Sequence, residues 1–318
     1  MKKIWQFIMI GALALTLTAC GSQTASDTGT KDTGSEVKTA EKIKVAVTII
    51  PEATFVEKVG GDRVEVVTMV PPGASPENYQ VSPKQMVDLS DSQLYFSIGI
   101  GAENGLVDKF ESLNKSMKRV PLETIVGEKY PDRFFEAEEG HDHDHETAES
   151  HEGHHHEGRD PHIWLSPKRA MVMVESIRDE LIALDPEHKE VYTQNAAAYL
   201  KDLEGASAEV QKVVDAMQTK AFIMYHPAFG YFADDFGLKM VEIEEDGKQA
   251  SAARIKEVID FAKSNDIHYI FYQEEFDSQQ AETIASEIGG AAVKVAPLAP
   301  DYVQNLKDIV EALESVAK

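Results

Sequence analysis

The sequence predicts an α/β protein of two lobes, each with a parallel-rich sheet flanked by helices, joined by one long helix. Its 318 residues suffice for two compact domains that each bury a core. In both halves, short β-branched or aromatic runs alternate with amphipathic patterns, which is typical of parallel sheets covered by helices on both faces. Between the halves, a single apolar stripe continues without interruption.

The first lobe, assigned to residues 42–185, begins with a strand followed by a helix. IKVAVTII is a β-branched run of strand length, and the amphipathic EATFVEKVGG follows Pro51. The same alternation recurs until a short RVPL closes this half. Strands are expected at 43–50, 63–70, 94–99 and 119–122, and helices at 52–61, 82–90 and 103–113.

The linking helix is expected at 186–218. Apolar residues recur in steps of four and three from Tyr192 to Met217, the spacing of one helix face. Pro186 suits a first helical turn, and a helix of this length extends roughly 50 Å. The second lobe is assigned to 219–318, with strands expected at 221–226, 239–243, 267–273 and 291–298 and helices at 251–264, 278–288 and 301–317.

The N-terminus has the pattern of an export signal. Lys2 and Lys3 precede an uncharged apolar run that is shorter than the roughly 20 residues of a spanning helix. The run ends at Cys20, the only cysteine, in what looks like a bacterial lipobox. We expect a signal peptide at 1–19, lipidation of Cys20 and a polar, flexible tether over 20–41. The alternative is an ordinary secretory signal with a chance cysteine.

The chain is strongly acidic. Lys plus Arg total 31 against 55 for Asp plus Glu, a formal charge of -24. Such a surface repels phosphate backbones, so nucleic-acid binding is not expected, while cationic ligands are attracted.

A histidine-rich loop is expected at 141–158. It combines seven of the 11 histidines with several carboxylates and no large apolar side chain, so it cannot pack a core. Imidazole and carboxylate bind zinc and similar ions. The loop therefore predicts an auxiliary metal collector, and the alternative is a polar loop without a metal function. Its histidines are His141, His143, His145, His151, His154, His155 and His156.

Three residues are candidates for a metal site fixed by the fold. His162 lies in the proline-bounded DPHIWLSP, just before an expected helix. His226 follows an apolar strand directly before a proline. Glu77 lies in the loop that leaves the strand RVEVVTMV. Ligands of open α/β sheets bind at the carboxyl ends of strands. Taken singly, each histidine would more often be a structural or surface residue, and Glu77 an exposed loop carboxylate.

Together, the lipobox, PPGASPENYQVSP, DPHIWLSP, HPAFGYFADDFGL and the histidine-rich insertion resemble the metal-specific solute-binding proteins of bacterial ABC importers. This is the zinc/manganese TroA-like family. The resemblance is to the zinc branch of the family, and it covers residues 43–317. It implies a metal site between the lobes, zinc as the transported substrate, an ABC permease as partner and a location outside the cytoplasm on a lipid anchor. It also implies a monomer without enzymatic activity.

The resemblance assigns His162 and His226 as metal ligands, with Glu77 at the position of the family's first histidine. Because a carboxylate suits harder ions, Glu77 keeps manganese or iron open as alternatives to zinc. We expect binding to weaken as pH falls toward the usual histidine pKa of about 6.5. A surface adhesion lipoprotein is the alternative function.

The fourth ligand is open. The positions where the family usually has carboxylates are Gln273 and Ala296, so Glu274, Glu275, water or a loop histidine could complete the site. Three protein ligands with an open position also describe a catalytic zinc site. An enzyme is not expected, since the sequence shows no placed general base such as that of a His-Glu-x-x-His helix.

Overall fold

The computed structural model describes residues 42–106, 109, 112–135, 158–244, 249–276 and 278–316. The expected signal peptide, Cys20, the tether and all seven histidines of the loop lie outside the described residues, as does part of the helix expected at 103–113. No helix in the described ranges is long and apolar enough to cross a bilayer.

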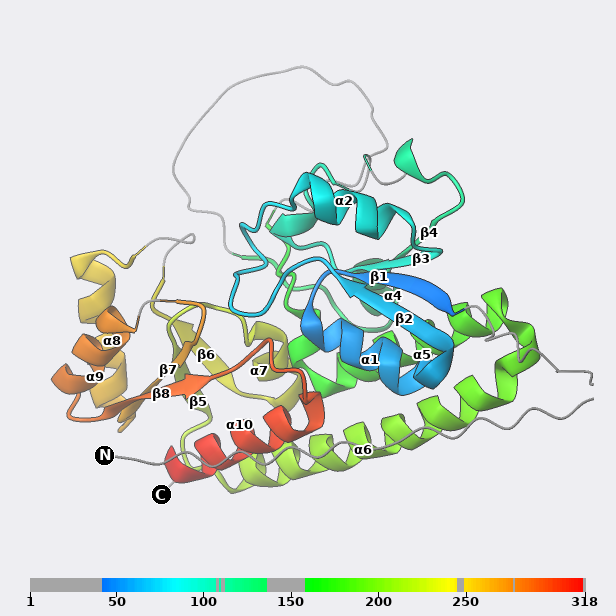
Figure 1. Cartoon of the computed structure of the whole chain (residues 1–318). Coiled ribbons are helices and arrows are strands. Elements are labelled where there is room, and N and C mark those ends of the chain that lie inside the picture. The colour runs from blue at the N-terminus through cyan, green and yellow to red at the C-terminus, as the bar shows by residue number, and fades with distance from the viewer. Residues whose placement is uncertain are drawn as a thin grey trace, which may run out of the picture. The chain divides into compact units, whose positions relative to one another are not determined.

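The first lobe has a four-stranded parallel sheet in the order β2-β1-β3-β4 (Figure 1). Val45 of β1 pairs with Val66 on one side and with Leu94 on the other. Val45 and Val47 are fully buried, as expected for a central strand covered on both faces. The strands are β1 (Ile43–Val47), β2 (Val64–Thr68), β3 (Leu94–Ser97) and β4 (Lys118–Pro121).

Helices of the first lobe follow its strands. Ser82 begins α2 with a capping box, because its side chain accepts a hydrogen bond from the backbone of Gln85. Of these helices, α4 was not expected from the sequence, since its eight residues are too few for a periodic pattern. The helices are α1 (Ile50–Gly60), α2 (Pro83–Ser90), α4 (Leu122–Lys129) and α5 (Pro167–Leu184).

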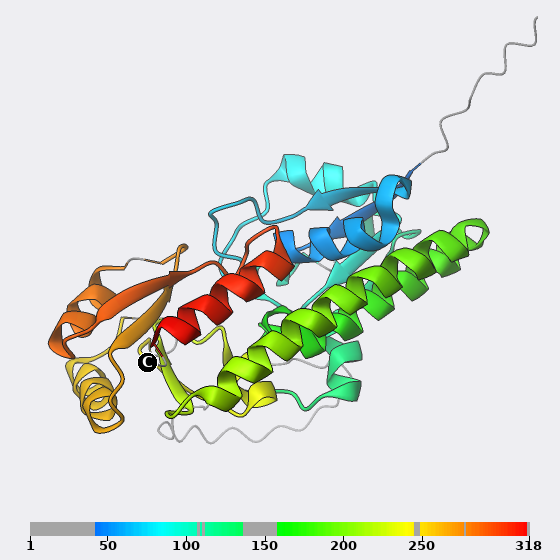
Figure 2. The same cartoon turned by 90° about the horizontal axis from the view of Figure 1, so that it is seen from below.

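The long helix is α6 (Lys189–Ala216), preceded by a single 3-10 turn, η4 (Pro186–His188). Its apolar stripe from Tyr192 to Val213 is buried. The helix packs against α1 and α5 of the first lobe and against α10 (Tyr302–Val316) near the C-terminus, as Figure 2 shows. It therefore contacts both lobes.

The second lobe repeats the architecture, with a parallel sheet in the order β6-β5-β7-β8. Its helix α7 was not expected, because it has only seven residues; Gly237, in the left-handed conformation, ends it. The predicted class of two α/β lobes is confirmed. The remaining elements are β5 (Ala221–Met224), α7 (Gly230–Phe236), β6 (Lys239–Glu242), α8 (Ala252–Ser264), β7 (Tyr269–Gln273), α9 (Gln279–Glu287) and β8 (Ala291–Val295).

Buried contacts join the lobes beside the strand ends. The Trp164 indole donates to the Pro297 carbonyl at 3.0 Å, and the Tyr302 hydroxyl donates to the Trp164 carbonyl at 2.6 Å. Arg169 of α5 pairs with Asp235 of α7 at 2.8 Å. These contacts oppose a wide opening of the lobes, because opening would expose buried polar groups without partners.

Candidate metal centre

The three candidate ligands come from three separate loops. Glu77 lies beyond β2, His162 directly precedes the turn η3 (Ile163–Leu165), and His226 follows β5 by two residues. Both β2 and β5 are parallel strands, so Glu77 and His226 lie beyond the carboxyl ends of their sheets, where open α/β proteins bind ligands.

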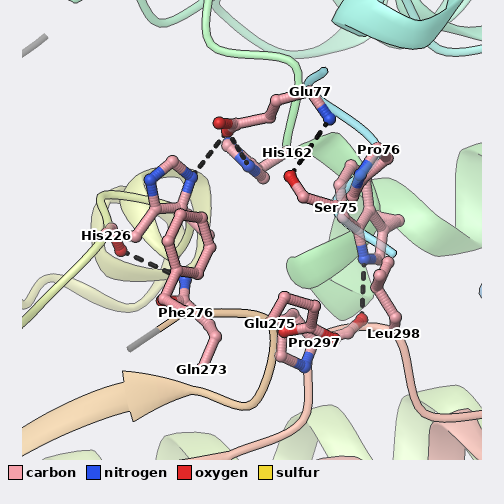
Figure 3. Close-up of a pocket in the computed structure, with 12 residues that line it drawn as sticks. Ser75, Pro76, Glu77, His162, His226, Gln273, Glu275, Phe276, Pro297 and Leu298 are labelled. Atoms are coloured by element: carbon pink, nitrogen blue, oxygen red, sulfur yellow. Dashed lines mark hydrogen bonds and ion pairs between the residues drawn. The ribbon is translucent and has the colours of Figure 1, made fainter. Parts of the chain in front are cut away.

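The structure brings these side chains together (Figure 3). Glu77 Oε1 lies 2.6 Å from His226 Nε2 and 3.4 Å from His162 Nε2. One potential ligand atom from each residue lies within 4.8 Å of the other two. Ligands bonded to one zinc ion at about 2.1 Å lie about 3.4 Å apart in a tetrahedron, so a small widening of the Glu77–His226 contact accommodates the ion.

Two buried carboxylates orient the histidine rings. His162 Nδ1 donates to Asp160 Oδ1 at 2.8 Å, and His226 Nδ1 donates to Glu244 Oε2 at 2.5 Å. Asp160 and Glu244 are both buried. Because each Nδ1 carries the proton, each Nε2 is left to face Glu77, an arrangement typical of metal-binding histidines.

Neither carboxylate was expected from the sequence to contact a ligand. Asp160 had a visible signal, since it lies two residues before His162 in DPH and also accepts the backbone N–H of His162 at 3.0 Å. Glu244 had none, because it reaches His226 only through the parallel pairing of β5 with β6.

The Glu244→Gln variant is expected to weaken metal binding by about 10- to 100-fold, the usual effect of removing a partner behind a ligand. The amide can accept from His226 but carries no negative charge to support its basicity. Glu242→Gln is the control, because Glu242 is the last residue of β6, two residues before Glu244, and its side chain is 41% exposed. Competition titration against a chelator measures both, and equal affinities would contradict the role of Glu244.

Protons compete with a metal ion for the two histidines. Burial lowers the pKa of His162, but hydrogen bonds with Asp160 and Glu77 outweigh it and raise that pKa to about 9. Burial likewise opposes protonation of His226, yet Glu244 and Glu77 raise its pKa. Although burial favours the neutral acid, both histidines lower the pKa of Glu77 well below its usual range. We therefore expect metal binding to weaken at a higher pH than the usual histidine pKa of about 6.5 predicts.

The space beside the ligands is small and has apolar walls. Phe276 stacks on the His226 ring at 4.5 Å between centroids, and Trp164 and Pro297 also line the cavity. The cavity holds about 20 Å³, enough for one water-sized particle. The site therefore suits a single ion rather than an organic solute.

The candidates for a fourth ligand differ in placement. Glu274 is exposed and pairs with Lys294 at 2.9 Å, away from the cavity. Gln273 lines the cavity and donates from Nε2 to the His226 carbonyl at 3.2 Å, while its buried Oε1 has no hydrogen-bond partner among the described residues. Glu275 also lines it, and burial raises the pKa of its carboxyl. Ala296 offers no ligand atom.

The fold and the site define a two-lobed solute-binding protein with side chains suited to a metal ion. The family model for the zinc-uptake complex component A, periplasmic (ZnuA), matches residues 45–316. The chain belongs to this family.

Relatives and solved structures agree with this family. The chain is 33% identical over 300 residues to the zinc-binding lipoprotein AdcA of Streptococcus pneumoniae serotype 4, covering 94% of this chain but only 56% of that one. It is 29% identical over 292 residues to the high-affinity zinc uptake system protein ZnuA of Bacillus subtilis, covering 91% and 87%.

A crystal structure of ZnuA superposes with a TM-score of 0.75 at 31% identity, covering 87% of this chain and 100% of that one. The Zn(II)-bound ZnuA-like domain of S. pneumoniae AdcA gives 0.67 at 26%, covering 87% and 99%. The laminin-binding protein Lbp of Streptococcus pyogenes gives 0.69 at 24%, covering 87% and 100%, which shows a shared fold alone.

Proposed function

We propose that this protein is the extracytoplasmic zinc-binding component of an ABC importer, holding Zn²⁺ with Glu77, His162 and His226 and delivering it to a membrane permease. The observation that carries the proposal is the convergence of two buried imidazole Nε2 atoms on one carboxylate. Zinc binds such nitrogen and oxygen ligands. The zinc-binding names of the relatives support the same ion.

The shape of the site favours zinc over manganese or iron. Zinc is satisfied by four ligands, whereas manganese prefers six, mostly oxygen. With about 20 Å³ free and aromatic walls, there is little room for the several waters that a six-coordinate ion would keep. Two imidazoles among three candidate ligands also suit zinc better than a harder ion.

The proposed activity is binding without catalysis. Asp160 and Glu244 each hold the Nδ1 proton of a histidine, and Glu77 is itself a proposed ligand. None of these three carboxylates is left to activate a water molecule. Glu275 or a water would complete the coordination of the ion.

The remaining parts of the proposal concern segments outside the described residues. Lipidated Cys20 would anchor the mature protein to the membrane surface. The tether up to residue 41 would let the lobes move relative to that anchor. The histidine-rich loop would collect ions for the site between the lobes.

The protein would act as a monomer. The closely joined lobes favour release of the ion through small movements of the ligand loops when the permease is engaged.

Metal selectivity tests the proposal. A competition titration of metal-free protein with Zn²⁺ and Mn²⁺ is expected to give at least about 100-fold tighter binding of zinc. Tighter binding of manganese would change the substrate. A surface adhesion protein, the alternative function, has no need of stoichiometric metal, so failure to bind either ion tightly would favour that alternative.

A further inference from the structure

The loop that carries Glu77 lies directly on a short 3-10 turn, η2 (Gly101–Glu103). The Ala102 N–H donates to the Pro76 carbonyl at 2.8 Å. A Cβ atom on Gly101 would lie 1.8 Å from the Glu77 carbonyl oxygen, closer than any real Cβ contact. The backbone of Glu77 therefore packs against Gly101 with no space for a side chain.

One buried carboxylate holds η2 in place. Glu103 is 4% exposed. Its Oε1 accepts the Ile98 N–H at 2.9 Å and the Thr48 hydroxyl at 2.5 Å, while its Oε2 accepts the Gly99 N–H at 2.8 Å. Thr48 directly follows β1, and Ile98 directly follows β3. Glu103 thus ties η2 to the ends of the two central strands.

We propose that Glu103 is a positioning residue of the metal site, which fixes the Glu77 carboxylate through Gly101 and Ala102. The hydrogen bonds of Glu103 go to Thr48, Ile98 and Gly99 and to none of the three proposed ligands. Glu103 instead fixes the turn η2, on which the loop that carries Glu77 lies. The inference rests on the proposed function and deepens it, because it makes the position of the Glu77 carboxylate depend on a residue in the core of the first lobe.

The surroundings of Glu103 argue against a purely structural role. Glu52 and Glu123 are buried nearby, and Glu103 itself makes no ion pair with Lys or Arg among the described residues. Burial, together with the charge of Glu123, raises the pKa of Glu103 to about 7. A buried carboxylate without a cation costs stability that an apolar residue would not. Such costs are typical of residues that serve a site.

The Glu103→Gln variant of the full chain tests the proposal. An amide can accept at only one of the two carboxylate positions, so η2 is expected to shift and zinc affinity to fall about tenfold or more. Glu52→Gln is the control, because Glu52 is equally buried and accepts the backbone N–H groups of Thr48 and Ile49 without touching η2. Its zinc affinity is expected to stay within about twofold of the parent, given the half-ångström tolerance of such sites.

Competition against a chelator strong enough to empty weak sites measures the affinity, and the visible spectrum of bound Co²⁺ reports ligand geometry. Glu103→Gln is expected to change that spectrum and Glu52→Gln to leave it unchanged. Equal losses of affinity in the two variants would overturn the proposal, because the effect would then follow from a disturbed core.

Gly101→Ala provides a second route if Glu103→Gln does not fold. Its methyl group must displace the Glu77 backbone, so the same loss of affinity and the same spectral change are expected. Gly205→Ala is its control, since a Cβ there meets nothing within 4 Å. Parental affinity in Gly101→Ala would overturn the proposal. A parent chain that bound no zinc would instead refute the proposed function.

Discussion

Replacing His226 with alanine in a chain lacking residues 141–157 is expected to abolish stoichiometric zinc binding. The substitution removes one of two imidazole ligands and the contact that holds Glu77 at 2.6 Å. Loss of a ligand exceeds the effect of losing a partner behind it, so the affinity is expected to fall by more than about 100-fold. It also leaves Glu244 buried without the hydrogen bond from His226.

The matched control is His268→Ala, because His268 is exposed and contacts Asp266 rather than the site. Equilibrium dialysis against a weak chelator, followed by elemental analysis, measures the zinc retained by each variant. Thermal unfolding of the metal-free proteins separates lost binding from lost folding. Equal zinc in a folded His226→Ala variant and in the control would show that His226 is not a ligand.

Zinc affinity is expected to fall steeply as pH is lowered from about 9 to 6. The ion needs both Nε2 atoms unprotonated, while the pKa of His162 is raised to about 9 and that of His226 is also raised. Below both pKa values, two protons compete with each ion, so affinity falls by about 100-fold per pH unit. Above both pKa values, the histidines carry no competing protons, so a further rise in pH no longer increases the affinity through them.

Calorimetry at pH 7.5 in two buffers with different ionisation enthalpies measures the proton release directly. The raised pKa of His162 predicts that at least about one proton leaves per zinc bound. Replacing His162 with alanine removes both the ligand and this proton. If His162 is the source of the proton, any zinc binding that remains in the variant should release fewer protons. Zinc binding by the parent without proton release would show that both imidazoles are neutral before the metal arrives.

Much of the fold could be predicted from the sequence because the central strands of both sheets are largely buried. IKVAV, for example, is apolar except for Lys44 and shows no regular alternation with polar residues, which is typical of central parallel strands. The stripe of α6 was equally clear over 28 residues. The short helices α4 and α7 were missed, since one or two turns show no usable period.

The candidate ligands could be predicted from their local context, while the residues that orient them depend on the tertiary fold. Each histidine is next to a proline, and His162 lies directly before a turn while His226 lies just after a strand. Glu244 lies 18 residues beyond His226 and is brought to it by β6. Glu103 acts on Glu77 only through η2. Gly101 is required because the Glu77 backbone occupies the place of a side chain, not because a turn needs a glycine there. No spacing along the chain shows these contacts.

The zinc content of the chain lacking residues 141–157, after dialysis against a weak chelator, decides whether Glu77, His162 and His226 form the metal site. Without the histidine-rich segment, any tightly held ion must come from the remaining part of the chain. One zinc per chain is expected. No retained metal in a folded protein would contradict it, because the segment would then be the source of tight binding and Glu77, His162 and His226 would not form the site.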